Sequence, residues 1–271
     1  MLTDKVSNIL REVAHAVVMP RFMALAAGDI EMKSPNEPVT IADRESEQSI
    51  GHSLRSLLPG SRVVGEEACS ANPALLARIC EGSVWIVDPI DGTANFAAGR
   101  APFAMMIALM RDGELVESWI LDPLIDRLAV AELGGGAWIG GARLRAEPSP
   151  SDPSLWHGIV SRAFLPETQQ TMVDGLSASV GRVDPTVRCA GHEYPLVATG
   201  ARDFALYWRT LVWDHAPGAL LLSEAGGRVM HLDGSTYDPC IARSGLLLAH
   251  DPTVAETFLA LKPGGHSEIL T

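Results

Sequence analysis

The stretch WIVDPIDGTANF, residues 85–96, begins as a buried strand and then places two carboxylates, Asp88 and Asp91, around a proline. A residue before proline is restricted to extended conformations, so the apolar strand is expected to reach Asp88. Gly92 and Thr93 follow at once, which indicates a turn and the start of a short helix. Two acids that repel each other at a strand end need a partner that offsets their charge. Other parts of the chain indicate which kind of partner this is.

Composition limits the possible functions. The 271 residues, 47% hydrophobic and 20% charged, can fold as one large or two small domains, at about 150 residues per domain. A formal net charge of −12 without a basic patch excludes nucleic acid as a partner. No run of about 18 apolar residues lacks a charge, so no membrane-spanning helix is expected. The four scattered cysteines form no CxxC pair and are expected to be reduced thiols of a cytoplasmic protein.

Hydrophobic periodicity predicts helices and strands in separate runs, which favours a layered α+β fold. Helices are expected at 4–27 with a kink at Pro20, and at 40–58, 167–179, 192–200, 213–225 and 252–261. Strands are expected at 61–65, 84–88 and 203–208, before Cys189, at 245–249, and as an antiparallel meander over 103–145. The segment 34–40 is expected to be a loop.

Acidic residues stand at the ends of strands or the starts of helices at two further points. VVGEEA ends an apolar strand with Glu66 and Glu67, and VWDHAPGALLLSEAGG places Asp214 at the start of an apolar helix. Taken singly, each is explained by a solvated strand end or a helix cap. Together with Asp88 and Asp91 they form an all-oxygen ligand set suited to Mg²⁺ or Mn²⁺. A cation among them would offset their repulsion and reverse the local field of an acidic protein.

A similar segment, DPLID (residues 122–126), serves as an internal control. It joins two expected strands and is followed by neither a Gly-Thr pair nor a helix start, so it is predicted to be a plain turn. For an isolated DPxDG segment a turn is also the simpler interpretation. The surroundings of residues 88–92, rather than the motif alone, therefore carry the prediction of ligands.

Five segments occur in the order KSPNEPVTIAD (33–43), GEE (65–67), WIVDPIDGTANF (85–96), ELGGGAWIGGARLR (132–145) and WDHAPGALLLSEAGG (213–227). This series resembles the signature segments of the inositol monophosphatase family of metal-dependent phosphatases. The resemblance implies a five-layered αβαβα sandwich with mostly antiparallel sheets. It also implies a homodimeric, lithium-sensitive enzyme that uses Mg²⁺ to hydrolyse a small phosphomonoester.

The resemblance implies a metal site with about two or three Mg²⁺ ions, or Mn²⁺ in their place. Glu66, Asp88 and the backbone carbonyl of Ile90 would hold the first ion. Asp88, Asp91 and Asp214 would hold a second, and Glu66 would share a third.

The resemblance also implies the remaining site residues. Thr93 and Glu66 would orient the attacking water, with Asp43 hydrogen-bonded to Thr93. On the residues alone, Asp43 is equally the acid of a capping box with Thr40. Backbone N–H groups of Gly92 and Thr93 would receive phosphate oxygens at a helix start. Contacts to substrate or phosphate are expected from Asp91, Gly92, Thr93, Ala190, Tyr207, Arg209 and Asp214.

The resemblance to the family is weakest at the residues that determine substrate specificity. Inositol-specific members carry a glutamate seven residues before the aspartate of the WD pair, and this chain has Tyr207 there. Tyr207 and Arg209 either meet a flat or anionic substrate or simply pack at a strand end. RCAGHEYP (188–195) also departs from the usual small-residue segment, with only Ala190 matching.

The predicted function is hydrolysis of a small phosphomonoester by metal-activated water, with inositol or sugar phosphates as the leading substrates. Alternatives are histidinol phosphate, fructose bisphosphate or a nucleotide 3′-phosphate, and a non-catalytic regulator that binds metal or phosphate. A boundary is expected at AEPSPSDPS (146–154). The half 1–146 would then carry most of the metal ligands and the meander, and the half 147–271 would add Asp214 and the substrate pocket.

Overall fold

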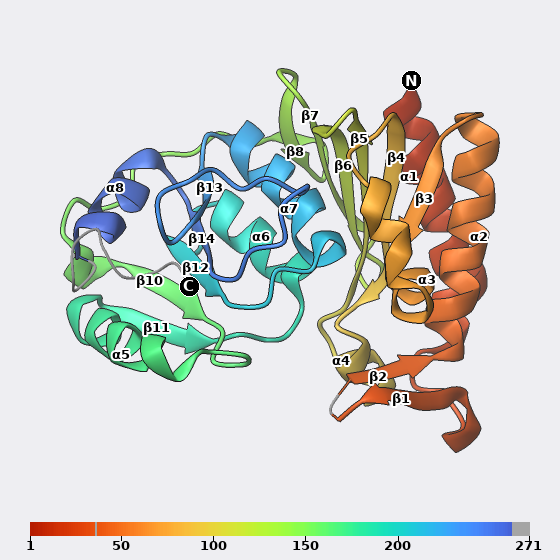
Figure 1. Ribbon diagram of the computed structural model, residues 1–271, viewed down its shortest axis with the longest axis horizontal. Helices are drawn as coiled ribbons and strands as arrows, with labels where there is room; N and C mark the ends of the chain where they lie inside the picture. The colour runs from red at the N-terminus through yellow and green to blue at the C-terminus, as the bar shows by residue number, and fades with distance from the viewer. Residues whose placement is uncertain (36, 262–271) are drawn as a thin grey trace.

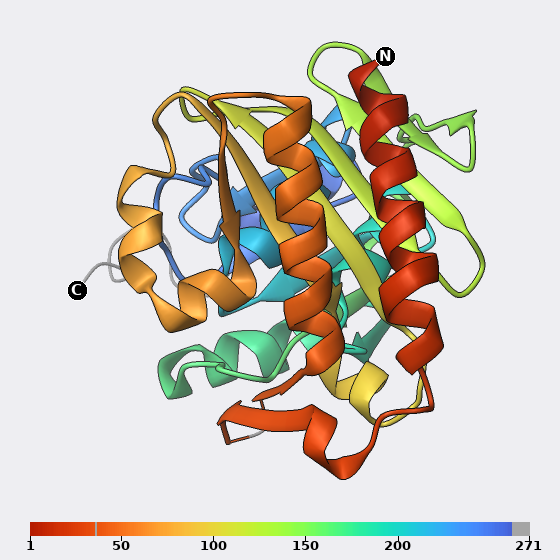
Figure 2. The same cartoon turned by 90° about the vertical axis from the view of Figure 1, so that its right-hand side faces the viewer.

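Layers of helix and sheet alternate across the molecule (Figure 1). The computed structural model describes residues 1–35 and 37–261. In order, the layers are α1 (Leu2–Val13) with α2 (Ile41–Leu57), a seven-stranded sheet, α6 (Ala190–Ala198) with α7 (Val212–Ala225), a five-stranded sheet, and α5 (Gln170–Ser179) with α8 (Pro252–Leu261). This is the α+β, αβαβα sandwich that the motifs predict. Figure 2 shows α1 and α2 lying across one face of the seven-stranded sheet.

The seven-stranded sheet has the order β3-β4-β5-β6-β7-β8-β9. Its strands are β3 (Arg62–Gly65), β4 (Ser83–Asp91), β5 (Ala104–Arg111), β6 (Glu114–Asp122), β7 (Arg127–Glu132), β8 (Gly136–Ile139) and β9 (Ala142–Arg143). Strands β3 and β4 run parallel, and β4 to β9 form the antiparallel meander. The proline does not end β4, which continues past Asp88 to Asp91 with a shift of register between them.

The five-stranded sheet has the order β11-β10-β12-β14-β13. Its strands are β10 (His157–Val160), β11 (Arg182–Pro185), β12 (Phe204–Tyr207), β13 (Arg228–His231) and β14 (Leu246–Ala249). The strand expected to end at Cys189 ends at Pro185, and β10 and β13 were not predicted. Each of these strands has four residues, too few for a period of two to stand out from the surrounding sequence.

Successive residues of the central strands face different helix layers. On β5, Met105 and Ile107 pack with α1 and α2, whereas Ala104 and Met106 pack with α6 and α7. The middle helices are covered by a sheet on each side, which is why the α7 sequence is apolar all round. Polar groups at the first turn of α7 therefore stand out as functional candidates.

Near the N-terminus the structure differs from the expected helix and loop. The helix ends as α1 at Val13 and continues only as a π turn, Ala14–Val18, and a 3₁₀ turn, Met19–Arg21, that contains the proline. The expected loop at 34–40 is instead part of a hairpin of β1 (Ile30–Ser34) and β2 (Glu37–Thr40).

Several short helical segments connect the main elements. They are Ala27–Asp29, α3 (Glu66–Ala71), Pro73–Arg78, α4 (Thr93–Ala97), Pro153–Leu155 and Glu167–Gln169. The first turn of the predicted helix at 167–179 is thus 3₁₀ in form, and α5 follows it. Within the described ranges, no helix has the length and apolar character needed to cross a membrane.

The cysteines correct another expectation. Cys80 and Cys240 form a disulfide with their Cα atoms 5.8 Å apart, while Cys69 and Cys189 are free and buried. The bonded pair lies 160 residues apart in sequence, so only the fold brings the two thiols together. Because disulfides persist in oxidising compartments, cysteine usage gives no support to a cytoplasmic location.

Candidate active site

Parallel pairing of β3 and β4 brings the first two acids together. Gly65 lies opposite Val87, so Glu66 and Asp88 follow at the same edge of the sheet. Helix α3 starts at Glu66, and Asp88 is 1% exposed. Glu66 and Asp88 are twenty-two residues apart in the chain. They become neighbours because parallel strands place their carboxyl ends together.

The middle helices bring the second half of the chain to the same edge. Asp91 Oδ2 accepts a hydrogen bond from the backbone N–H of Gly191, at the start of α6, at 2.6 Å. Asp214 lies in the first turn of α7. A cavity of about 460 Å³ opens here, and every site residue predicted from the sequence except Asp43 lines it.

Negative charge gathers at this point without an equal positive charge. Burial, and then the charges of Glu66, Asp91 and Asp214, raise the pKa of Asp88 well above its usual range. Burial and the same kind of repulsion raise the pKa of Asp214, and burial raises that of Asp91 to about 7. Asp88 Oδ1 is buried and has no hydrogen-bond partner among the residues that the structure describes. These oxygen donors fit a hard divalent cation, because its charge would offset the repulsion and satisfy the orphaned oxygen.

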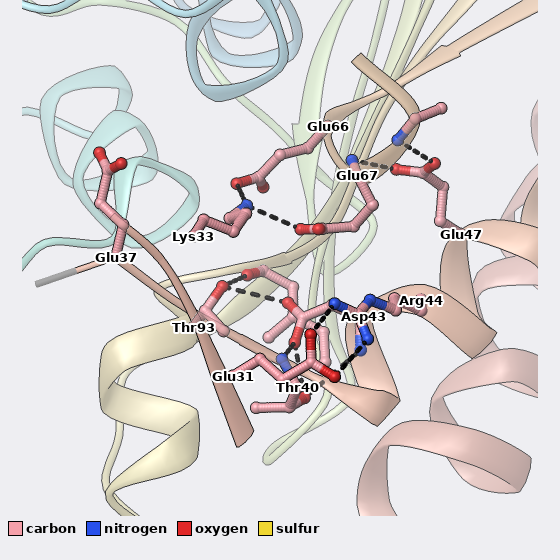
Figure 3. Close-up of polar contacts among 12 residues, drawn as sticks. Glu31, Lys33, Glu37, Thr40, Asp43, Arg44, Glu47, Glu66, Glu67 and Thr93 are labelled. Atoms are coloured by element: carbon pink, nitrogen blue, oxygen red, sulfur yellow. Dashed lines mark hydrogen bonds and ion pairs between the residues drawn. The ribbon is translucent and has the colours of Figure 1, made fainter. Parts of the chain in front are cut away.

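Lys33, on β1, is the cation that pairs directly with Glu66. Its Nζ donates to Glu66 Oε1 at 2.6 Å and to Glu67 Oε1 at 2.9 Å (Figure 3). Burial opposes the charge on Lys33, but the two glutamates together raise its pKa above its ordinary value. Across the described part of the chain no three His, Cys, Asp or Glu side chains are grouped at metal-ligand spacing. Glu66 is paired with Lys33 in this arrangement, so its use as a metal ligand would require that ion pair to open.

Asp43 fulfils both roles considered for it. Its Oδ2 accepts from Thr40 N at 2.8 Å, and Thr40 Oγ1 accepts from Asp43 N, which completes the predicted capping box of α2. Its Oδ1 accepts from Thr93 Oγ1 at 3.1 Å, and Ile90 O also lies within hydrogen-bond distance of that hydroxyl, at 2.9 Å (Figure 3). Burial raises the pKa of Asp43 to about 7. One carboxylate thus ties the start of α2 to the start of α4.

Gly92 separates the acids from α4 in a left-handed conformation, with φ of 84°. A Cβ there would lie 3.1 Å from Pro102 O and 3.3 Å from Arg188 O. Both the φ angle and the close backbone therefore favour glycine. Thr93 begins α4 beside it, as the sequence predicts.

Sequence analysis missed Glu47, which stands behind the site. Its carboxylate accepts hydrogen bonds from the N–H groups of Glu67 at 2.7 Å and Ala68 at 2.9 Å, so it caps α3 from the neighbouring helix (Figure 3). A Cβ on Gly65 would lie 2.2 Å from Glu47 Cδ, so a larger residue there would displace this capping carboxylate. A signal was present, since Glu47 lies one helical turn after Asp43 on the same face of α2.

Glu193, on α6, was missed as well. It is 1% exposed, and Tyr207 donates a hydrogen bond to its Oε2. Tyr207 lines the cavity, and its hydroxyl is already engaged by Glu193. Arg209 is engaged too: it pairs with Glu37 of β2, and its guanidinium lies 4.3 Å from the Phe164 ring centroid.

Comparison with known proteins adds independent findings. The model of the inositol monophosphatase family matches residues 3–263. A histidinol-phosphatase of Mycobacterium tuberculosis is 35% identical over 254 residues, which cover 89% of this chain and 92% of that protein. An inositol-1-monophosphatase of Bacillus subtilis is 32% identical over 233 residues, 84% of each protein. The crystal structure of an IMPase/NADP phosphatase complexed with NADP and Ca²⁺ matches with a TM-score of 0.84 and 21% identity over 98% of both chains, which shows a shared fold.

Proposed function

The chain belongs to the inositol monophosphatase family and is a phosphoric monoester hydrolase, and we propose that it acts on a small phosphorylated metabolite with Mg²⁺ as cofactor. The observation that carries the proposal is that Glu66, Asp88, Asp91 and Asp214 line one cavity, where Asp88 Oδ1 has no partner within the described part of the chain. Cations bound among these oxygen donors would let the carboxylates keep their charge at neutral pH.

The proposed ligands are the carboxylates of Glu66, Asp88, Asp91 and Asp214 together with the carbonyl oxygen of Ile90. About two or three Mg²⁺ ions bound there would supply a nucleophile at neutral pH and neutralise charge on the phosphate and the leaving oxygen. Mn²⁺ would serve the same donors. The presence of Ca²⁺ in the IMPase/NADP phosphatase complex supports a divalent cation.

The protein's own groups then bind and orient the ester. N–H groups of Gly92 and Thr93 bind phosphate oxygens at the start of α4. The Thr93 hydroxyl, held by Asp43 at 3.1 Å, accepts a hydrogen bond from the attacking water and aligns it with Glu66. Ala190, at the start of α6, lines the cavity beside them.

The wider setting is also part of the proposal. We propose that the halves 1–146 and 147–271 meet at the cavity. The first half carries the seven-stranded sheet and the β1–β2 hairpin, and the second carries the five-stranded sheet. We place the enzyme in the cytoplasm as a homodimer, and the Cys80–Cys240 disulfide argues against that location. Alkylation of free thiols in cell extracts, followed by mass spectrometry, measures whether Cys80 and Cys240 are bonded to each other. A reduced pair would support the cytoplasm, and a bonded pair would support an oxidising compartment.

The test is phosphate release from a panel of phosphomonoesters, with Mg²⁺ and with EDTA. The panel contains inositol and sugar phosphates, fructose bisphosphate, nucleotide 3′-phosphates and, because of the M. tuberculosis relative, L-histidinol phosphate. Activity should disappear in EDTA and return with Mg²⁺, and lithium should inhibit it. Activity undiminished in EDTA would remove the metal from the proposal, whereas insensitivity to lithium would contradict only that part of it.

A further inference from the structure

The Cys80–Cys240 disulfide is a covalent link between the two halves of the chain. Cys80 lies between the turn Pro73–Arg78 and strand β4 of the seven-stranded sheet, whereas Cys240 lies in the loop 232–245 that connects β13 to β14. A Cβ on Gly113 would lie 3.3 Å from Cys240 Sγ and 3.7 Å from Cys80 Cβ, so the bond also lies against the turn between β5 and β6. The bond therefore fixes this loop to the half of the chain that carries most of the proposed metal ligands.

The loop 232–245 has few other ties to that half. Apart from the contacts of Cys240 itself, no hydrogen bond or ion pair among the described residues joins residues 233–245 to residues 1–146. Side chains at positions 233–244 are exposed or half-buried, and Tyr237 adds apolar packing against the cluster between the sheets. Segments with few buried contacts open locally at a low free-energy cost. Much of the attachment of this loop to the first half therefore depends on the disulfide.

The same loop holds the segment 208–211, which leads from β12 into α7. Thr210 Oγ1 donates a hydrogen bond to the carbonyl oxygen of Arg243, and Ser244 Oγ donates to the carbonyl oxygen of Trp208 at 2.7 Å. These bonds pair the backbone just before α7 with the backbone just after the disulfide. The position of the loop therefore influences where α7 begins.

Apolar packing connects the disulfide with α7 as well. Cys80 and Cys240 pack against a buried cluster that contains Trp213, which is 6% exposed. Within the described part of the chain Trp213 Nε1 has no hydrogen-bond partner, so packing alone holds this ring. Trp213 directly precedes Asp214, the one proposed carboxylate ligand from the second half. A shift of the loop would therefore move Asp214 relative to Asp88 and its neighbours.

We propose that the Cys80–Cys240 disulfide is a redox-sensitive brace that sets the affinity of the site for divalent cations. The bonded form holds the first turn of α7 against the seven-stranded sheet, and the reduced form releases it. The inference rests on the proposed metal-dependent function. Reduction by a dithiol breaks the S–S bond, passes two electrons and two protons to the cysteines, and leaves the dithiol as a disulfide. Both cysteines are half-buried, within reach of such a reductant.

Thermodynamic linkage gives the inference a second, independent readout. If the bond raises the affinity for Mg²⁺ by some factor, Mg²⁺ must raise the equilibrium constant for forming the bond by the same factor. Groups that orient metal ligands without touching the metal change its affinity by about 10- to 100-fold. Because the disulfide acts through the loop and the segment 208–211, we expect the lower end of this range, about tenfold.

The experiment compares the oxidised and the dithiol-reduced wild-type protein. Calorimetric titration with Mg²⁺, and the Mg²⁺ dependence of p-nitrophenyl phosphate hydrolysis, should both show half-saturation at about tenfold higher Mg²⁺ after reduction. Thiol alkylation in dithiol redox buffers should show that Mg²⁺, compared with EDTA, favours the bond by the same factor. Equal Mg²⁺ affinities of the two forms overturn the inference, as does a pair that stays reduced in an oxidising buffer.

Cys240→Ser separates the disulfide from the other thiols. The variant should bind Mg²⁺ as weakly as the reduced wild type, and a dithiol should not change it further. An effect of the dithiol that persists in this variant would have to come from Cys69 or Cys189 and would overturn the inference. Cys80→Ser removes the same bond from its other end and replaces Cys240→Ser if that variant does not fold. Mg²⁺ affinity equal to that of the oxidised wild type in the folded variant also overturns it.

Hydrogen exchange in EDTA tests the brace without metal and without activity. Reduction should speed amide exchange in the loop 232–245 and in the segment 208–214, while β5 and β6 exchange equally in both forms. Faster exchange confined to the loop overturns the inference, because the bond would then hold only the loop. If wild type cleaves no phosphomonoester with Mg²⁺, the proposed function fails, whereas calorimetry and exchange still decide the role of the disulfide.

Discussion

Two Asp-Pro segments of the seven-stranded sheet, 88–91 and 122–126, look alike in sequence and behave differently in the fold. Asp88 and Asp91 are 1% and 8% exposed, and β4 runs through them. Asp126 has a side chain that is 66% exposed and a φ of 47°, in a turn between β6 and β7. Asp122 Oδ1 accepts from Leu124 N at 3.1 Å, as a turn-forming aspartate does.

The neighbours of the two segments explain the difference. Asp88 and Asp91 face further carboxylates from α3, α6 and α7, so burial and repulsion raise their pKa values. Asp126 Oδ1 instead accepts from Arg11 Nε at 2.7 Å, and Asp122 lies 3.7 Å from Arg127. An acid paired with arginine stabilises a turn, whereas buried acids gathered without arginine mark a site where charge is needed for function.

The largest expected effect on activity comes from a substitution in the first segment, 88–91. Asp91→Asn should lower kcat by at least about 100-fold on p-nitrophenyl phosphate while the protein still folds, because one ligand charge is lost. Asp126→Asn should leave kcat unchanged. Steady-state rates and circular dichroism of both variants check this. Wild-type activity in Asp91→Asn would make both segments plain turns.

A smaller effect is expected from Glu47, an acid of the site region that lines no part of the cavity. Glu47→Ala removes the cap from α3, which costs about 1 kcal/mol of helix stability, and should lower activity about tenfold. It should also raise the Mg²⁺ concentration needed for half-maximal rate, since Glu66 begins that helix. Glu45→Ala on the same helix, which loses only a surface pair with Arg21, is the control. Equal Mg²⁺ curves for both variants would contradict the positioning role.

The free energy of unfolding of the metal-free protein should fall as pH rises. Asp91 of the first Asp-Pro segment contributes to this effect, and Asp126 of the second does not. Asp43 and Asp91 have folded pKa values of about 7, above unfolded values near 3.9, so they favour the folded state at low pH. That contribution is complete below about pH 4 and is lost as pH rises through about pH 7.

Thermal melts in EDTA should therefore show a Tm several degrees lower at about pH 8 than at about pH 5. Mg²⁺ should abolish the difference, and Asp91→Asn should reduce it. Asp126→Asn is the control and should retain it in full. If the Tm of the metal-free wild type does not change with pH, other groups of the chain must compensate the charges of Asp43 and Asp91.

The smallest effect is expected for stability in the second segment. Asp126→Asn removes an exposed pair with Arg11 and keeps a residue that tolerates the left-handed φ. The free energy of unfolding should fall by about 0–1 kcal/mol, and by less at high salt. Urea titrations at two salt concentrations measure it. A loss well above this range would show that the turn is part of the structural core.

Long periodic segments were predictable from the sequence, and short or long-range features were not. Helices 40–58 and 213–225 and the meander agree with the structure, because their hydrophobic patterns extend over many residues. The β1–β2 hairpin and β10 were missed, since short strands carry little pattern. Glu193 was missed for another reason: nothing near it in sequence indicates that Tyr207 lies above it.

The sequence by itself determined the long strands and helices and where acids interrupt them, because apolar alternation, proline and glycine act on the local backbone. Only the tertiary structure decided which acids lose water together. Desolvation and Coulomb repulsion depend on groups within a few ångströms, and here those groups come from α3, β4, α6 and α7. That is why DPID and DPLID resemble each other as sequence and differ as chemistry.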